Sequence, residues 1–225
     1  MLQNLSARLN AVAELVPVCD TLADIGTDHG FLPLYLLNSK KIRRAVCADI
    51  NRSPLESAKR NFSGTGLEAY AVFRLGNGMQ VLSPGEADVA VIAGMGGDTI
   101  ASLLAADESE TPVFVLQPMS KTENLRSWLC HNGWGIEAWS LVADSGRLYE
   151  VLRISRSAPK AGWPFVRFGS PEGVDPGLYQ RYLAEKTASV NKSLRDALSA
   201  GVPDGGRIAL LREDLSALSE IQNNL

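Results

Sequence analysis

Two carboxylates lie within a short glycine turn, Asp24-Ile25-Gly26-Thr27-Asp28-His29-Gly30. One apolar run enters this turn and another leaves it, which predicts a strand, a tight turn and a helix. In a nucleotide-binding α/β sheet, a cofactor lies at such a turn, beyond the carboxyl end of the first strand. The spacing differs from the dinucleotide fingerprint G-x-G-x-x-G, and two carboxylates would repel a pyrophosphate. S-adenosylmethionine carries a sulfonium and no phosphate, so we assign Asp24, Gly26, Asp28 and Gly30 to binding that cofactor.

Polar or glycine-rich segments also follow the next two predicted strands. Asp49 ends the second strand, where a carboxylate can accept hydrogen bonds from both ribose hydroxyls, although a surface acid can also end a strand. We assign the adjacent Ile50 to the same cofactor site. Asn77 and Gly78 follow the third strand and could reach the adenine edge, but Asn-Gly is also an ordinary turn dipeptide.

The fourth predicted strand ends in Ala93-Gly94-Met95-Gly96-Gly97, which leaves backbone amides bare at the same edge of the sheet. A flat group could lie against them, and the alternative is packing at the start of the next helix. We assign Ala93 and Gly94 to the cofactor. Met95, Gly96 and Gly97, with Pro118 after the fifth strand, are assigned to the substrate.

The elements that position these residues alternate along the chain. The patterns predict strands over residues 21–25, 45–50, 69–75, 89–93, 113–117, 136–142 and 149–154, and helices over 6–15, 31–38, 53–62, 98–106 and 121–132. Ser53 is expected to cap its helix, with Pro54 as the first helical residue. Such alternation predicts a doubly wound, seven-stranded, mostly parallel Rossmann-like sheet whose last two strands form an antiparallel pair.

The composition changes after Ile154. Residues 157–177 are rich in proline and glycine, and two helical stretches follow, from Tyr179 to Ala197 and from Ile208 to Leu225. A turn containing Gly201, Pro203, Gly205 and Gly206 separates them, which predicts an antiparallel helical hairpin of coiled-coil type. We therefore expect a cofactor-binding domain over residues 1–155, and a linker with a helical domain over residues 156–225.

The bulk composition sets limits on the partners. The chain has 225 residues, a net charge of -3 and a mean hydropathy of -0.01, so a nucleic-acid partner would need a local basic surface. No apolar run is long enough to span a bilayer, and the first helix is amphipathic rather than a signal peptide. The three cysteines show neither metal spacing nor a disulfide framework, so we expect a cytoplasmic protein without a metal site.

Four segments together resemble the TrmK family of bacterial tRNA (adenine-22-N1)-methyltransferases. They are residues 24–33, Ile92 to Gly97, Leu116-Gln117-Pro118, and Gly146 to Leu152. The resemblance spans residues 1–154, and residues 168–194 fit the family's tail. It implies an S-adenosylmethionine-dependent class I methyltransferase with a C-terminal coiled-coil domain, which acts on N1 of one tRNA adenine. Two positions depart from the family: Phe31 stands where tyrosine is frequent, and Asn77 stands where aspartate is frequent.

Methylation of a ring nitrogen mainly requires that the two reactants be positioned, and it leaves a cationic base. Asp28 is our catalytic candidate for stabilising that charge, although it could instead cap a helix or bind the cofactor's ammonium. His29 could stack on the target base or have a structural role. The chain lacks an Asn/Asp-Pro-Pro-Tyr/Phe motif, which suits exocyclic amines, and a Pro-Cys nucleophile, which suits cytosine C5.

A tRNA partner implies phosphate contacts. The candidate groups are Lys40, Lys41, Arg43, Arg44, Arg181, Lys186, Lys192 and Arg195, of which most could be solvated surface charges. The helical hairpin could grip tRNA or form a dimer, so the oligomeric state, monomer or dimer, stays open. A small-molecule methyltransferase and a non-catalytic S-adenosylmethionine- or RNA-binding protein are the alternative functions. An NAD-linked dehydrogenase fits poorly, because Asp28 would face the pyrophosphate.

Overall fold

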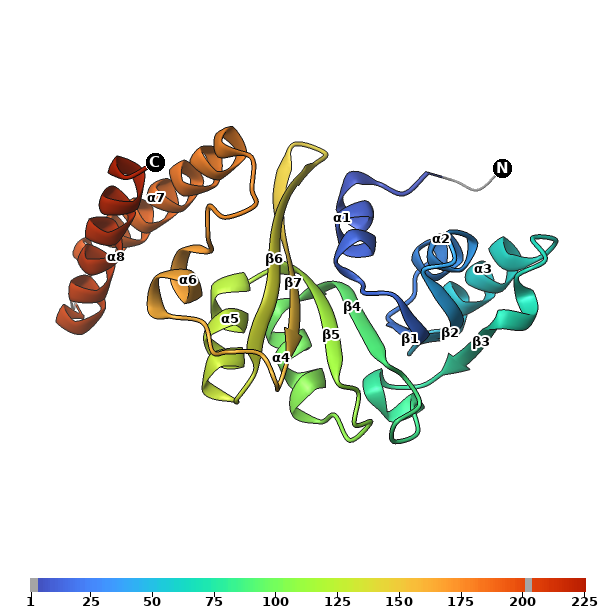
Figure 1. Ribbon diagram of the computed structural model, residues 1–225. Coiled ribbons are helices and arrows are strands. Elements are labelled where there is room, and N and C mark those ends of the chain that lie inside the picture. Colours follow the sequence, from blue (N-terminus) through green and yellow to red (C-terminus); the bar gives the residue numbers. More distant parts are fainter. Residues whose placement is uncertain (1–3, 201–203) are drawn as a thin grey trace. The chain divides into compact units, whose positions relative to one another are not determined.

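The computed structural model describes residues 4–200 and 204–225, which form two compact units, Met1–Ala161 and Gly162–Leu225 (Figure 1). The sequence-based division after residue 155 lies six residues before the boundary between these units. In the described residues, no helix combines the length and the apolar character that a membrane span requires.

The first unit is built on a sheet with the strand order β3-β2-β1-β4-β5-β7-β6. The strands are β1 (Cys19–Ile25), β2 (Ile42–Asp49), β3 (Ala71–Leu75), β4 (Val89–Gly96), β5 (Val113–Ser120), β6 (Gly135–Asp144) and β7 (Arg147–Ser155). The first five are parallel, β7 pairs antiparallel with β5, and β6 pairs antiparallel with β7. The predicted seven-stranded, mostly parallel sheet with an antiparallel pair is therefore confirmed.

Helices cover both faces of this sheet (Figure 1). They are α1 (Ala7–Leu15), α2 (Phe31–Asn38), α3 (Arg52–Phe62), α4 (Gly97–Ala105) and α5 (Thr122–His131), with short 3-10 turns at Glu68–Tyr70 and Gly78–Val81. One apolar core packs Ile100 of α4 and Leu129 of α5 against the sheet, and the other packs Val12 of α1 and Leu36 of α2 against its opposite face. Apolar strands buried on both sides produce the continuous apolar runs of the sequence.

Two local predictions near the site were wrong. Helix α3 begins at Arg52 with Asn51 as its N-cap residue, so Pro54 is the third helical residue, where a missing N–H still costs no helical hydrogen bond. Strand β4 continues to Gly96 rather than ending at Ala93, because it keeps pairing with β5 through an irregular register. Gly94 has a φ of 79° at that irregularity, a conformation that glycine adopts without a steric penalty.

The second unit contains α6 (Trp163–Phe168), α7 (Pro176–Leu198) and α8 (Gly205–Asn223), and α7 packs against α8 (Figure 1). The predicted linker thus contains a helix, which is tied to α8 because Arg167 forms an ion pair with the buried Asp214. Gly205 and Gly206 do not form a turn: they begin α8, which is capped by Asp204. The other expected turn residues, 201 and 203, lie outside the described residues. Coiled-coil packing of α7 and α8 stays a prediction.

Candidate active site

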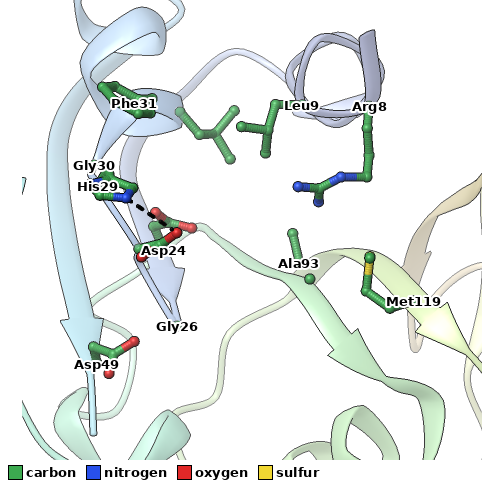
Figure 2. A pocket seen from close by; sticks show the side chains of 13 residues that line it. Arg8, Leu9, Asp24, Gly26, His29, Gly30, Phe31, Asp49, Ala93 and Met119 are labelled. Carbon is green, nitrogen blue, oxygen red and sulfur yellow. Dashed lines mark ion pairs between the residues drawn. The ribbon is translucent and has the colours of Figure 1, made fainter. Parts of the chain in front are cut away.

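A cavity of about 390 Å³ opens at the carboxyl ends of β1, β2 and β4 (Figure 2). This volume is within the range of small-molecule sites. Its lining residues come from α1, the glycine turn, the start of α2 and the ends of the strands: Arg8, Leu9, Asp24, Gly26, Asp28, His29, Gly30, Phe31, Leu32, Asp49, Ala93, Gly94 and Met119. The site is therefore where a ligand of a doubly wound sheet is expected.

The glycine turn brings backbone close to the cavity. Gly26 has a φ of 82°, and its N–H donates to the Ala48 carbonyl at 2.8 Å, which ties the turn to β2. Gly30 has a φ of 67° and precedes α2, and a Cβ added there would lie 3.0 Å from the Ala58 side chain. Both positions therefore favour glycine for conformational reasons, and Gly30 also for packing.

Three carboxylates line the cavity, those of Asp24, Asp28 and Asp49. Asp24 is buried, and this burial raises the pKa of its carboxyl from 3.8 to about 6, with the negative charge of Asp49 acting in the same direction. Asp49 is partly exposed at the end of β2, where one of its oxygens accepts the Asn51 N–H at 2.7 Å. The carboxylates make the site suited to a cation or to hydroxyl donors.

Asp28 and His29 lie at the exposed part of the site. The His29 Nε2 atom is 3.5 Å from Asp28 Oδ2, and the two side chains are 47% and 81% exposed. The His29 ring also stacks on Phe31, with 5.3 Å between the centroids and an interplanar angle of 23° (Figure 2). The turn thus presents a carboxylate and an aromatic surface to an incoming molecule.

The structure brings together eight of the residues assigned from sequence: Asp24, Gly26, Asp28, His29, Gly30, Asp49, Ala93 and Gly94. Seven others are not among the lining residues: Ile50, Asn77, Gly78, Met95, Gly96, Gly97 and Pro118. The Ile50 side chain is 63% exposed beside Asp49. The roles assigned to both groups stay predictions.

Packing explains two of these residues without a ligand. The Met95 side chain packs against the glycine turn. A Cβ added at Gly26 would lie only 2.3 Å from Met95 Cε. Gly97 is buried at the start of α4, and a Cβ added there would lie 2.5 Å from the Lys121 carbonyl oxygen. Packing at a helix start, which was the sequence-level alternative, accounts for Gly97.

The sequence assignments missed the wall of the cavity formed by α1. Arg8 and Leu9 line it, as does Met119 after the fully buried Gln117. The amphipathic pattern of residues 6–15 predicts the helix, but no local signal indicates that the helix covers the site. A polar Gln117 within a buried strand was the available signal, since buried polar side chains need partners.

This fold and this cavity are those of a Rossmann-like class I methyltransferase, and residues 5–152 match the family model described as a methyltransferase domain. A Bacillus subtilis tRNA (adenine(22)-N(1))-methyltransferase is 37% identical over 151 residues, which span 66% of this chain and 63% of that relative. The chain belongs to the TrmK family within this class.

Two solved structures agree over nearly the whole chain. The crystal structure of the B. subtilis m1A22 tRNA methyltransferase TrmK superposes with a TM-score of 0.83 at 26% identity, covering 98% of this chain and 99% of that one. The structure of M. capricolum TrmK with S-adenosylhomocysteine superposes with a TM-score of 0.81 at 26% identity, covering 97% of this chain and 98% of that one. The likeness therefore includes the C-terminal helices, which lie beyond the matched methyltransferase domain.

Proposed function

We propose that the protein methylates N1 of adenine 22 in tRNA, with S-adenosylmethionine as the methyl donor. The observation that carries this proposal is the cavity in which Asp24, Asp28 and Asp49 meet positive-φ glycines at the carboxyl edge of the sheet. The activity of the B. subtilis relative and the S-adenosylhomocysteine bound to the M. capricolum relative support it. A tRNA substrate implies a cytoplasmic location.

The residues present fit this cofactor. Asp49 has the position from which a carboxylate accepts ribose hydroxyls, and the exposed Ile50 beside it offers an apolar surface for the adenine ring. Asn77 and Gly78 are proposed to reach the adenine edge. Asp24 supplies negative charge to a cationic ligand, whereas a dinucleotide would place its pyrophosphate among three carboxylates.

When bound, S-adenosylmethionine supplies a methyl group on a cationic sulfur. The adenine N1 lone pair forms the new N–C bond while the C–S electron pair stays on sulfur, so the positive charge passes to the base. We propose that Asp28, which lines the cavity, stabilises that charge or accepts a proton from N6. The target adenine must leave its stack to be methylated, and the His29–Phe31 pair offers a surface to receive it.

The test uses radiolabelled S-adenosylmethionine, tRNA that lacks the modification, and the same tRNA with guanine at position 22. We expect label in 1-methyladenosine from the first tRNA and none from the second. The predicted substrate residues Met95, Gly96 and Pro118 belong to the last part of β4 and β5, and Gly97 begins α4, at the edge of the sheet where such a base would approach. Label found only in small metabolites would favour a small-molecule methyltransferase instead.

Replacing Asp28 with asparagine is expected to lower the single-turnover rate of methyl transfer about 100-fold. The affinity for S-adenosylhomocysteine should change little, because the Asp28 side chain is 81% exposed at the mouth of the cavity. Rapid-quench kinetics and calorimetry measure the two quantities. Glu108→Gln, an exposed carboxylate before the start of β5, is the control. Equal losses in rate and affinity would make Asp28 a cofactor ligand only.

Several of the candidate phosphate-contact residues already have partners within the protein. Three basic residues near β2 have partners within the protein: Lys41 donates to the Ala13 carbonyl at 2.7 Å, and the exposed Arg43 and Arg44 pair with Asp20. On α7, Arg181 pairs with Glu185 at 2.9 Å and Lys186 lies over the Tyr182 ring. Among the candidate cations, all of which lie in the described part of the chain, the exposed ones outside these pairs are Lys40, Lys192 and Arg195, and the last two are one helical turn apart on α7. We propose that these two contact tRNA phosphates.

The double variant Lys192→Glu, Arg195→Glu is expected to bind tRNA about 10-fold more weakly at low salt. The slope of log affinity against log salt should fall by about 2, because two phosphate contacts are lost. Filter binding over a salt series measures both effects. Affinity for S-adenosylhomocysteine is the control, since both residues belong to the C-terminal unit. An unchanged salt slope would contradict the proposed contacts.

A further inference from the structure

The charges around the cavity are separated. The carboxylates of Asp24 and Asp49 lie on one side, and the Arg8 guanidinium points in from α1 on the other (Figure 2). Among the described residues that line this cavity, Arg8 is the one with a fixed positive charge. A ligand with separated positive and negative groups would match this arrangement.

Arg8 is held in place by three contacts. Its backbone N–H donates to Asp144 Oδ2 at the end of β6, at 3.0 Å, and this bond holds the pKa of the Asp144 carboxyl below its usual range. Its Nη1 atom donates to Gln117 Oε1 at 2.5 Å, and its guanidinium carbon lies 5.9 Å from the centroid of the Tyr149 ring. These contacts come from β5, β6 and β7, so the guanidinium is positioned before any ligand arrives.

Gln117 links Arg8 to the backbone of the cavity. Its side chain is completely buried, and its Oε1 atom also accepts the N–H of Gly94 at 3.2 Å. Its Nε2 atom donates to the Pro118 carbonyl at 2.8 Å, which fixes the orientation of the amide. The bond to Gln117 uses one donor of the guanidinium, which carries further N–H groups for a ligand.

We propose that Arg8 binds the carboxylate of the cofactor's methionine portion, while the carboxylates across the cavity attract its ammonium and sulfonium groups. This inference rests on the proposed function. A guanidinium is suited to this contact because it can bind a carboxylate through two parallel hydrogen bonds. Without Arg8, the cofactor's carboxylate would have no positively charged partner among the described residues that line the cavity.

The test pairs one substitution with one change in the ligand. S-adenosylmethionine and decarboxylated S-adenosylmethionine differ by the carboxylate in question, and calorimetry measures both affinities for the wild type and for Arg8→Met. We expect the wild type to prefer the carboxylated ligand about 10- to 100-fold, and Arg8→Met to lose this preference. The variant should bind the decarboxylated ligand about as well as the wild type does, as in a double-mutant cycle.

Arg153→Met is the matched control, because Arg153 Nη1 donates to the Leu15 carbonyl at the other end of α1, away from the cavity lining. Its ligand preference should equal that of the wild type. Arg8→Lys, which keeps the charge, should retain part of the preference for the carboxylated ligand. It replaces Arg8→Met in the test if Arg8→Met does not fold. Equal weakening of both ligands by Arg8→Met, or an unchanged preference, would overturn the inference. A wild type that binds neither ligand would instead contradict the proposed function.

Discussion

Asp24→Asn is expected to stabilise the free protein at pH 8 while weakening its binding of S-adenosylmethionine. Burial raises the pKa of the Asp24 carboxyl from 3.8 to about 6, so ionisation at neutral pH is unfavourable in the folded state. Because the folded pKa exceeds the unfolded one, the stability that this group contributes is full below pH 3.8 and is lost as the pH rises through 6.

A neutral amide avoids that loss. We expect a gain of about 2–3 kcal/mol in the free energy of unfolding at pH 8 and almost none at pH 4, measured by urea denaturation. Asp20→Asn, on the same strand but with its carboxylate exposed and paired with Arg44, is the control and should show no such gain. A lower stability of Asp24→Asn at pH 8 would contradict this account of the site.

Binding should change in the opposite direction. The affinity of the wild type for S-adenosylmethionine is expected to rise between pH 5 and pH 7.5, as Asp24 ionises with its pKa of about 6. Asp24→Asn should bind about 10- to 100-fold more weakly at pH 7.5, with a flatter pH profile. Comparison of the variant with the wild type isolates the contribution of Asp24 from that of the other ionisable side chains that line the cavity, His29, Asp28 and Asp49.

A gain in stability together with a loss of affinity is expected where a residue is selected for ligand binding rather than for the stability of the unliganded protein. A buried strand end would be more stable with an apolar or amide side chain. On the proposed function, the Asp24 carboxylate would become favourable when a cation enters the cavity beside it. Stability in the absence of ligand and affinity for the ligand are therefore coupled through one ionisable group.

The sequence predicted the parts of the site that depend on local backbone chemistry. The helix over residues 31–38 has the bounds expected from the pattern, and the strand before the glycine turn ends at Ile25 as expected. The carboxyl edge of a parallel sheet then brings Asp24, Asp49 and Gly94 together whatever the details of the loops. Periodicity and turn residues were sufficient for this level of description.

The parts of the site that the sequence did not predict depend on contacts between segments that are far apart in the chain. The Arg8–Gln117 hydrogen bond joins residues separated by 109 positions, and the Arg8–Asp144 bond joins residues separated by 136. The extension of β4 past Ala93 likewise depends on continued pairing with β5 rather than on its own glycine-rich sequence. Local pattern predicts an element's type, but tertiary packing decides which of its side chains reaches the cavity.

Glu150 shows that a residue carrying a family resemblance need not line the cavity. It lies on β7 within the Gly146–Leu152 segment, and it forms an ion pair with Arg126 of α5, with the two side chains 5% and 0% exposed. Its Oε2 atom also accepts the Trp139 Nε1–H at 2.9 Å. Neither Glu150 nor Arg126 lines the cavity.

Glu150→Gln is therefore expected to lower the free energy of unfolding by about 3 kcal/mol, because the buried Arg126 charge loses its countercharge. Glu137→Gln is the matched control, because Glu137 lies on β6, the strand paired with β7. Its pair with Arg153 is about one-quarter exposed, so a loss of no more than about 1 kcal/mol is expected. Thermal and urea denaturation of the two variants would compare them directly.

The β6–β7 pair adjoins the site through β5. Strand β7 pairs with β5 up to the Leu116–Leu152 position, one residue before Gln117, which holds Arg8 and Gly94. Glu150→Gln should thus reduce the folded fraction on heating while leaving the methyl-transfer rate of the folded enzyme close to that of the wild type at low temperature. The double variant Arg126→Met, Glu150→Leu should recover most of the lost stability, because it removes both charges. Loss of activity in a fully folded Glu150→Gln protein would instead place Glu150 in the binding machinery.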